Sequence, residues 1–254
     1  MTIPKTALVT GAGRRIGRAI ALDLARHGWT VCVHYNRSRD EADDVVAEIG
    51  RDGGSAVALG ADLAREDAVV DLARRAVDAL GPIGCLVNNA SRFEPDDIGS
   101  MTRQSWDAHL EANLRAPLVL TQQMAASLPQ DAEGVVVNII DQRVWNLTPH
   151  FLSYTVSKSG LWTLTRTLAL ALAPRIRVNG IGPGPTLPST RQSEPQFRRQ
   201  YESMPLQRHT TEVEICNALR FIIDARSMTG QMIALDAGQH LGWTQPGPND
   251  PNLE

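Results

Sequence analysis

The stretch Thr10-Gly-Ala-Gly-Arg-Arg-Ile-Gly17 joins a short strand-like run, residues 6–10, to a helical pattern over residues 15–27. Glycines let the backbone turn tightly and approach a pyrophosphate, and the start of the helix offers free N–H groups and a partial positive charge. The position between strand and helix therefore predicts a dinucleotide site, whereas the alternative is a glycine-rich turn without function. The residues expected to contact the dinucleotide are Gly11, Arg15, Ile16 and Gly17.

Strand-like and helical segments alternate along the rest of the chain. The strand-like segments are 6–10, 30–35, 55–59, 85–88, 134–140, 176–179 and 231–235. The helical segments are 15–27, 40–51, 65–80, 102–128, 151–173 and 212–224. Parallel strands need long crossover connections, and strands covered on both faces are continuously apolar. The pattern predicts a single-domain α/β fold of the Rossmann type, a doubly wound sheet of about seven parallel strands with helices on both faces.

Two segments depart from this alternation. Residues 182–205 contain five prolines and no convincing strand, so we expect a substrate loop over the pocket at the carboxyl ends of the strands. The last residues, 244–254, contain three prolines and are expected to form a loosely ordered C-terminal tail. Residues 1–243 are then expected to form one domain.

Composition excludes several classes of protein. Of the 254 residues, 43% are hydrophobic and 21% are charged, which fits a globular chain rather than a disordered one. The net charge of -3, without a basic block, gives no reason to expect a nucleic-acid partner. Cys32, Cys85 and Cys216 lie far apart, so we expect neither a disulfide framework nor a metal site. Without a targeting or membrane-spanning segment, the chain is expected to be cytoplasmic, with no membrane partner.

The segment Tyr35-Asn36-Arg37-Ser38 bears on the choice of cofactor. NAD-binding chains usually carry an acid here for the ribose 2′-hydroxyl, whereas arginine suits a 2′-phosphate. No acid occurs before Asp40. We expect Arg15 and Arg37 to converge on a phosphate, with Asn36 and Ser38 beside it, so the cofactor is predicted to be NADPH. The alternative is that both arginines are solvated surface charge.

Tyr154 and Lys158 lie four residues apart, on one face of the predicted helix. A neighbouring ammonium stabilises a phenolate and lowers the pKa of the phenol, which prepares it for proton transfer at neutral pH. The chain has only two lysines, and placing one here favours a compact ammonium over a guanidinium. The alternative is an ordinary amphipathic helix face.

These features, taken together, resemble the short-chain dehydrogenase/reductase family over nearly the full chain. The resemblance is carried by Thr10-Gly-x-x-x-x-x-Gly17, Asp62, Asn88-Asn-Ala90, Asn113, Tyr154-x-x-x-Lys158 and Pro183-Gly184. It implies that Tyr154 is the proton donor, that Lys158 binds the nicotinamide ribose, and that Asn113 holds a water in the proton relay. It also implies a homotetramer. The further cofactor contacts that it implies are Asp62 at the adenine, together with Leu63, Asn89, Ala90, Ser91, Pro183 and Gly184.

One position departs from the family pattern. Thirteen residues before Tyr154, where the family usually has a substrate-binding serine, this chain has Asp141. A carboxylate would repel a developing alkoxide, whereas a carboxyl group can help to supply the proton that a C=N nitrogen must gain. The position therefore favours reduction of a C=N bond. The alternatives are that Asp141 only pairs with Arg143, or that the chain has lost activity.

This substitution points to a branch of the family. The chain resembles pteridine reductases and, more loosely, bacterial dihydromonapterin/dihydrofolate reductases of the short-chain type. The segments that carry this resemblance are Gly13-Arg-Arg-Ile-Gly17, His34-Tyr-Asn-Arg-Ser38, Asn88-Asn-Ala-Ser-x-Phe93, the Asp141 and Tyr154 pair, and Arg177-Val-Asn-Gly-Ile-Gly-Pro-Gly184. The resemblance implies that Phe93 stacks on a pterin, and that Ser91 and Arg15 reach both the pterin and the cofactor phosphate. Together with Asp141 and Tyr154 they are the expected substrate-binding residues.

Three functions stay open on the sequence. The first is NADPH-dependent reduction of a pterin, dihydropterin or dihydrofolate-type C=N bond, with Asp141, Tyr154, Lys158 and Asn113 as the catalytic set. The second is a general short-chain reductase of a ketone or 3-oxoacyl substrate, and the third is a non-enzymatic NADP(H)-binding regulator. The helices 102–128 and 151–173 are apolar beyond one buried face, which also favours burial between subunits.

Overall fold

The computed structural model describes residues 2–242, and the expected tail 244–254 lies outside the described residues. Seven parallel strands form one sheet in the order β3-β2-β1-β4-β5-β6-β7. The strands are β1 Thr6–Val9, β2 Thr30–Tyr35, β3 Ala56–Gly60, β4 Cys85–Asn88, β5 Gly134–Ile139, β6 Ile176–Pro183 and β7 Met232–Leu235. The predicted doubly wound parallel sheet is confirmed.

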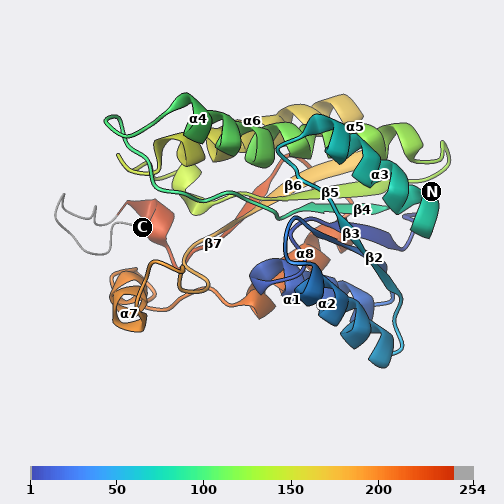
Figure 1. Ribbon diagram of the computed structural model, residues 1–254, viewed down its shortest axis with the longest axis horizontal. Helices are drawn as coiled ribbons and strands as arrows, with labels where there is room; N and C mark the ends of the chain where they lie inside the picture. Colours follow the sequence, from blue (N-terminus) through green and yellow to red (C-terminus); the bar gives the residue numbers. More distant parts are fainter. Residues whose placement is uncertain (1, 243–254) are drawn as a thin grey trace.

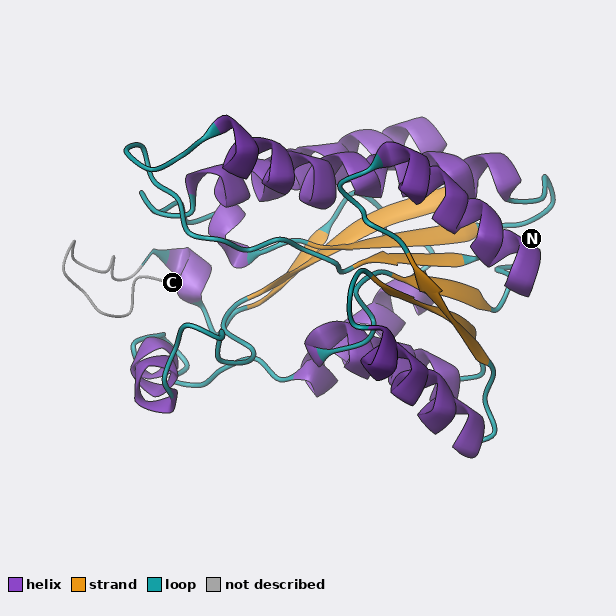
Figure 2. Ribbon diagram, viewed as in Figure 1, coloured by secondary structure: helices purple, strands orange, loops and turns teal. Residues whose placement is uncertain are grey.

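Helices cover both faces of the sheet (Figure 1). The helices α1 Arg15–Arg26, α2 Arg39–Arg51 and α8 Glu212–Asp224 lie on one face. The helices α3 Glu66–Leu80, α4 Arg103–Leu110, α5 Ala116–Ser127 and α6 Leu152–Leu172 lie on the other. Figure 2 shows the sheet between these two helical layers.

The strands are apolar throughout because both of their faces are buried. In β1, Ala7 and Val9 pack into one core and Leu8 into the other. In β5, Val135 and Val136 divide in the same way between the two cores. Alternation of side chains along a strand sends neighbours to opposite faces, so two helical layers require an unbroken apolar run.

The expected helical region 102–128 is present, but its middle departs from the α-helix. Between α4 and α5 the structure has one turn of π-helix, η1 Glu111–Arg115. Pro117 lies in the first turn of α5 and has no N–H to donate to the carbonyl of Asn113, four residues earlier. The regular α-helical bonding is therefore interrupted here, and Asn113 lies within the π-helical turn.

The segment 182–205 also differs from the expectation of a plain loop. Strand β6 continues to Pro183, where it pairs with Leu235 of β7. A short helix, α7 Glu194–Glu202, then occupies the middle of the segment. It begins with a capping box in which Ser193 and Gln196 satisfy each other's backbone N–H groups, and Pro195 stands in its first turn.

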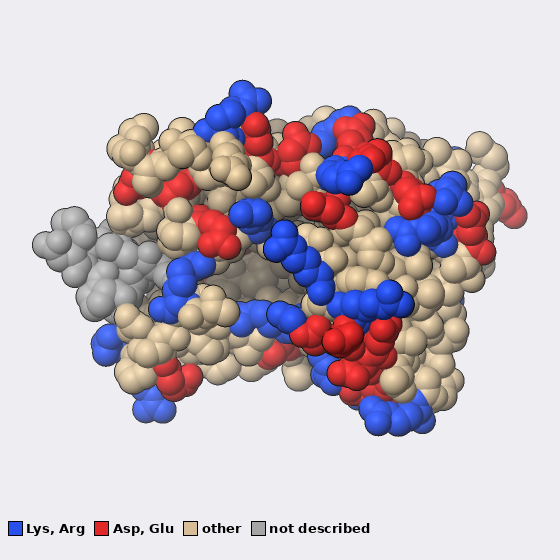
Figure 3. All heavy atoms as spheres, in the orientation of Figure 1, with Lys and Arg blue, Asp and Glu red and all other residues tan. Residues whose placement is uncertain are grey.

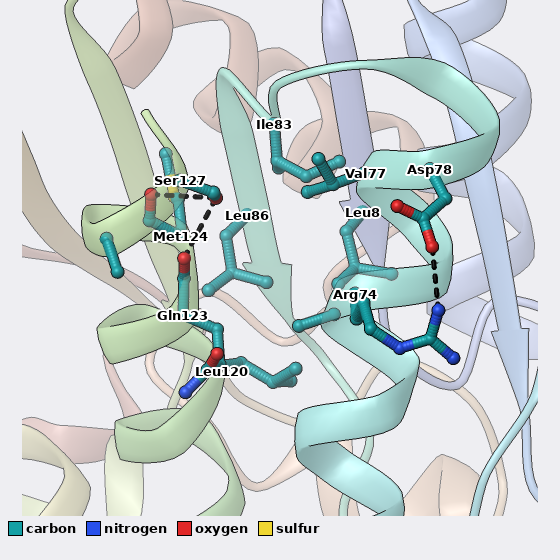
Figure 4. Close-up of a pocket in the computed structure, with 12 residues that line it drawn as sticks. Leu8, Arg74, Val77, Asp78, Ile83, Leu86, Leu120, Gln123, Met124 and Ser127 are labelled. Atoms are coloured by element: carbon teal, nitrogen blue, oxygen red, sulfur yellow. Dashed lines mark hydrogen bonds and ion pairs between the residues drawn. The ribbon is translucent and has the colours of Figure 1, made fainter. Parts of the chain in front are cut away.

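A cavity of about 260 Å³ lies between α3 and α5, with Leu8 and Leu86 on its floor (Figure 4). Its charged rim is internally paired, because Arg74 binds Asp78 at 2.7 Å. The cavity is therefore an apolar hollow on one face of the sheet, lined by different residues from the candidate site described below. None of the helices within residues 2–242 is long and apolar enough to cross a membrane.

Candidate active site

A second cavity, of about 310 Å³, lies at the carboxyl ends of the strands. Figure 3 shows this face hollowed, with Lys and Arg side chains around the hollow. The cavity brings together side chains from residues 10–17, which we call the glycine loop, and from the end of β5, the start of α6 and the segment 182–205. The expected site residues in its lining are Arg15, Ile16, Asn89, Ser91, Phe93, Asp141, Tyr154, Lys158, Pro183 and Gly184.

The glycine loop forms the part of the site that a dinucleotide requires. Gly11 has φ +64°, a conformation that favours glycine. A Cβ at Gly17 would collide with the carbonyl oxygen of Gly11 and would lie 2.6 Å from Asn89 Nδ2. The Thr10 hydroxyl accepts from the N–H groups of Asn89 and Ala90, each at 3.0 Å, so the loop is tied to the end of β4.

The start of α1 is available to an anion. The residue before it, Arg14, makes no capping hydrogen bond through its side chain, so the first N–H groups of the helix have no side-chain acceptor there. A helix start behind a close-packed glycine turn suits a pyrophosphate. The residues present therefore fit a dinucleotide.

His34 fixes the glycine loop and was not among the residues expected in the site. Its Nδ1 accepts from the N–H of Gly11 at 3.1 Å, so the neutral ring must donate from Nε2 to the carbonyl of Ala61, also at 3.1 Å. Burial lowers the pKa of His34 to about 4. The signal in the sequence was a histidine inside the otherwise apolar run that forms β2.

The expected pair of phosphate-binding arginines takes two different positions. Arg15 donates to the carbonyls of Leu187 and Pro188, at 3.1 and 2.9 Å, and so binds the segment 182–205. Arg37 and Asn36 are exposed, and Ser38 is half-buried at the start of α2. The structure therefore does not show Arg15 turned toward the end of β2.

Two of the expected cofactor contacts, Asp62 and Leu63, lie just after β3. Asp62 is exposed, and its Oδ1 accepts from the N–H of Ala64 at 3.0 Å. The Leu63 side chain is buried in the core on the α3 face. Of these two neighbours, only Asp62 presents a side chain to solvent.

Asp141 and Tyr154 are in direct contact. The Tyr154 hydroxyl donates to Asp141 Oδ2 at 2.7 Å, and the N–H of Arg143 donates to Asp141 Oδ1 at 2.7 Å. The guanidinium of Arg143 donates instead to Thr148 Oγ1, so the contact of Arg143 with the carboxylate is through its backbone. Both carboxylate oxygens therefore accept hydrogen bonds, and one of them comes from the expected proton donor.

The electrostatics at Tyr154 differ from the expectation that Lys158 lowers its pKa. Burial raises the pKa of Tyr154 well above its usual value, and the Asp141 carboxylate raises it further. Burial lowers the pKa of Lys158 to about 8, against the opposing effect of Asp141. Lys158 Nζ lies 5.8 Å from the centre of the Tyr154 ring and donates to the carbonyl of Ile139 at 2.8 Å. Tyr154 thus retains its proton.

Aromatic rings form one wall of the cavity. Phe93 stacks on Phe151 with ring centres 4.5 Å apart and meets Tyr154 edge-on at 4.7 Å. The guanidinium of Arg191 lies 5.2 Å from the Phe93 ring. Ser91 is exposed at the rim of this wall. A flat ring system can stack on such a surface.

Asn113 is buried, and its side chain contacts the protein on both sides. Its Oδ1 accepts from the N–H of Arg92 at 2.7 Å, while its Nδ2 donates to the carbonyl of Arg92 at 2.9 Å and to Ser157 Oγ at 3.0 Å. These contacts fix the segment that carries Phe93. Within residues 2–242 there is no cluster of three or more His, Cys, Asp or Glu side chains that could hold a metal ion.

The fold and the glycine loop define a dinucleotide-dependent oxidoreductase, and comparison with known proteins identifies the family. A model of the short chain dehydrogenase family matches residues 5–199, and the chain belongs to that family. FolM alternative dihydrofolate reductase 1 from Brucella canis, solved with NADP, is 51% identical, with a TM-score of 0.93 and 98% of each chain covered. A short chain dehydrogenase from Burkholderia cenocepacia, also solved with NADP, is 32% identical, with a TM-score of 0.87 and coverage of 94% of this chain and 99% of the other.

Curated relatives include a different reductase. The 3-oxoacyl-(acyl-carrier-protein) reductase FabG of Staphylococcus epidermidis is 33% identical over 242 residues, which cover 93% of this chain and 99% of the relative. The chain is therefore an NADP-dependent short-chain reductase, and the expected cofactor is confirmed. Its two groups of relatives act on different substrates according to their names.

Proposed function

We propose that the protein reduces a C=N bond of a pterin, dihydropterin or dihydrofolate-type substrate. The observation that carries this proposal is the hydrogen bond from the Tyr154 hydroxyl to Asp141 Oδ2. A substrate nitrogen that gains a proton suits this pair, because the carboxylate orients the phenol and keeps it protonated, so that Tyr154 has a proton to donate. The 51% identity with a protein named alternative dihydrofolate reductase supports the same substrate class.

The roles of the side chains follow from their positions. NADPH supplies the hydride when it is bound. Tyr154 delivers a proton to the substrate nitrogen, Asp141 accepts from Tyr154 and orients it, and Lys158 holds a positive charge 5.8 Å from the phenol ring. Phe93 offers its ring to a flat substrate, and the segment 182–205 covers the cavity.

The remaining expected contacts belong to the same proposal. The glycine loop, the ends of β2 and β4 and the turn after β6 hold the cofactor. We assign this role to Gly11, Arg15, Ile16, Gly17, Asn36, Arg37, Ser38, Asp62, Leu63, Asn89, Ala90, Ser91, Pro183 and Gly184. Arg15 and Ser91 also reach the substrate, and Asn113 supports the proton relay.

A homotetramer is part of the proposal. Helix α6 has an exposed Leu170, at 84% relative exposure, and Val156 is also exposed on this helix. Apolar side chains exposed on a long helix are suited to burial against a second copy of the same helix.

Reduction of a 3-oxoacyl thioester is the second candidate, because the FabG relatives match almost the whole chain. Asp141 speaks against it, since a carboxylate next to a developing alkoxide destabilises the transition state. An NADP(H)-binding regulator would not need the buried Tyr154 and Lys158 pair.

A turnover screen tests the proposal. Purified protein and NADPH are mixed with dihydrobiopterin, dihydrofolate, acetoacetyl thioester and a simple ketone, and the loss of NADPH absorbance is followed. The proposal expects kcat/KM for a pterin or dihydrofolate to exceed that for either carbonyl compound. Faster reduction of the thioester would favour a 3-oxoacyl thioester reductase instead. Absence of turnover with all four compounds would favour an NADP(H)-binding regulator.

A further inference from the structure

Two buried polar pairs link α4 and η1 to α6. His109 Nδ1 lies 2.7 Å from Ser153 Oγ, and Asn113 Nδ2 donates to Ser157 Oγ at 3.0 Å. His109 and Asn113 are four residues apart along α4 and η1, and Ser153 and Ser157 are four residues apart along α6. The two pairs therefore lie one helical turn from each other. Ser153 directly precedes Tyr154, and thus one of the two pairs adjoins the expected proton donor in the sequence.

The same two side chains hold the backbone on both sides of Phe93. Asn113 binds the N–H and the carbonyl of Arg92, at 2.7 and 2.9 Å. His109 Nε2 accepts from the N–H of Glu94 at 3.2 Å. Phe93 is the residue between these two bound peptide groups, so rotation of its backbone is restricted from both ends.

Asp96 completes the connection between α6 and residues 92–96, which we call the Phe93 segment. Its Oδ2 accepts from the Ser153 hydroxyl, and its Oδ1 accepts from the N–H of Ser153 at 3.1 Å. Its backbone carbonyl accepts from the N–H of Leu152 at 3.2 Å. A buried residue of the Phe93 segment therefore serves as the N-terminal cap of the helix that carries Tyr154.

The hydrogen bonds define the proton position on His109. Because Nε2 accepts from the N–H of Glu94, the neutral ring carries its proton on Nδ1, which faces Ser153 Oγ and the carbonyl of Ser105. Burial and the nearby Arg92 lower the pKa of His109, against the Ser105 carbonyl, Asp96 and Glu94. The neutral form, which alone can accept from Glu94, is therefore favoured at neutral pH.

We propose that His109, Ser153 and Asp96 are positioning residues that fix the Phe93 ring against Tyr154 and thereby select flat heterocyclic substrates. The selection of substrate rests on the proposed function, whereas the placement of Phe93 does not. Side chains of α4 and η1 thereby hold the backbone on both sides of one ring at the site, and α6 binds Asp96 in the same segment.

The test compares His109→Ala with His109→Gln and with a matched control, His27→Ala. His27 Nδ1 makes the same contact as His109 with the carbonyl four residues earlier, at 2.7 Å, but it is exposed at the end of α1. We expect His109→Ala to raise KM for dihydrobiopterin about tenfold or more while the Kd for NADPH is unchanged. His109→Gln should restore part of this loss, since its amide oxygen can accept from Glu94.

Two further measurements separate positioning from general damage. The double variant His109→Ala/Phe93→Leu should have nearly the same KM as Phe93→Leu alone, because His109 acts on the substrate through Phe93. Amide hydrogen exchange should rise at Glu94 in His109→Ala and in Ser153→Ala, but not in His27→Ala. Additive effects on KM, or exchange at Glu94 that stays unchanged in a folded variant, would refute the proposal.

The exchange measurement also separates this proposal from the proposed function. If the native protein reduces no pterin, the substrate class is wrong, yet faster exchange at Glu94 would still show that His109 holds the Phe93 segment. If His109→Ala does not fold, Ser153→Ala supplies the same comparison, because it removes the contact with both His109 and Asp96.

Discussion

Asp141 changes the chemistry of the phenol beside it. A serine at this position would donate to a substrate carbonyl, whereas Asp141 accepts from Tyr154 and raises the pKa of that hydroxyl. A phenol with a raised pKa is a weaker acid, but it stays protonated over the whole physiological range. The pair is therefore prepared to donate a proton rather than to accept one.

Replacing Asp141 with serine should test this role directly. We expect Asp141→Ser to lower kcat/KM for dihydropterin by about 10²-fold or more, the scale of a general acid. Binding of NADPH, measured by fluorescence titration, should be unchanged, and Tyr154→Phe should abolish turnover. Unchanged turnover of dihydropterin by Asp141→Ser would show that the carboxylate has no part in the reaction.

The buried Lys158 should set the alkaline limit of activity. Its pKa of about 8 means that the ammonium is lost as the pH rises through that value, while Tyr154 is still protonated. The kcat for dihydropterin should therefore fall above about pH 8, and Lys158→Arg, which keeps its charge, should lack this fall. A kcat that is constant from pH 7 to about pH 10 in the native enzyme would contradict the assignment.

The segment 182–205 is held in place by the glycine loop. Arg15 is the donor, and its acceptors are the carbonyls of Leu187 and Pro188. The contact connects the part of the site that fits the dinucleotide with the segment that covers the substrate cavity. It can therefore couple the position of the segment to the state of the glycine loop.

Loss of this contact should loosen the segment. We expect Arg15→Ala to increase the rate at which trypsin cleaves within 182–205, because two hydrogen bonds to its backbone are removed. Arg14→Ala is the matched control, since Arg14 pairs with Glu41 on α2 and not with the segment. Equal cleavage rates in the two variants would show that Arg15 does not hold the segment closed.

The elements show where sequence reasoning succeeds and where it fails. The strands were predicted well because each is a short apolar run between long helical patterns. The π-helical turn was missed because side-chain periodicity hardly distinguishes one wider turn, although Pro117 gave a signal. Helix α7 was missed because the five prolines of residues 182–205 suggested a loop, although Ser193 and Gln196 have the spacing of a capping box.

Some contacts of the candidate site were predictable from the sequence and others were not. The direct contact of Asp141 and Tyr154 agrees with the predicted pair, because their spacing places one at the end of a strand and the other on the next helix. The binding partner of Arg15 was not predictable, since a long side chain can choose among several acceptors at similar cost. The role of His34 depends on contacts between distant segments, and its position within one strand does not reveal them.

The buried His34 should make the stability of the protein depend on pH. Its pKa is about 4 in the folded protein and 6.5 in an ordinary environment, so only the unfolded chain gains the proton between these values. The contribution of His34 to the free energy of unfolding should be fully present above pH 6.5 and fall by about 3 kcal/mol as the pH drops to 4. Urea unfolding at several pH values measures this, and His34→Asn should show a smaller decrease than the native protein.

Apolar side chains on the surface of α6 bear on the assembly state of the protein. The exposed Leu170 and Val156 on α6 favour burial against another subunit. We expect sedimentation at micromolar concentration to give a homotetramer, and Leu170→Glu should shift the distribution toward smaller species. A monomer at this concentration for the native protein would refute the expectation.

The scarcity of lysine has a practical consequence for covalent labelling. Besides the chain's first amino group, the only primary amines are Lys5, which is exposed beside Trp29, and Lys158, which is 2% exposed. An amine-specific reagent should therefore modify Lys5 rapidly and leave the amine in the cavity intact. Lys5 directly precedes β1, at the amino ends of the strands, whereas the candidate site lies at their carboxyl ends. The protein should therefore retain its activity when it is labelled or immobilised through Lys5.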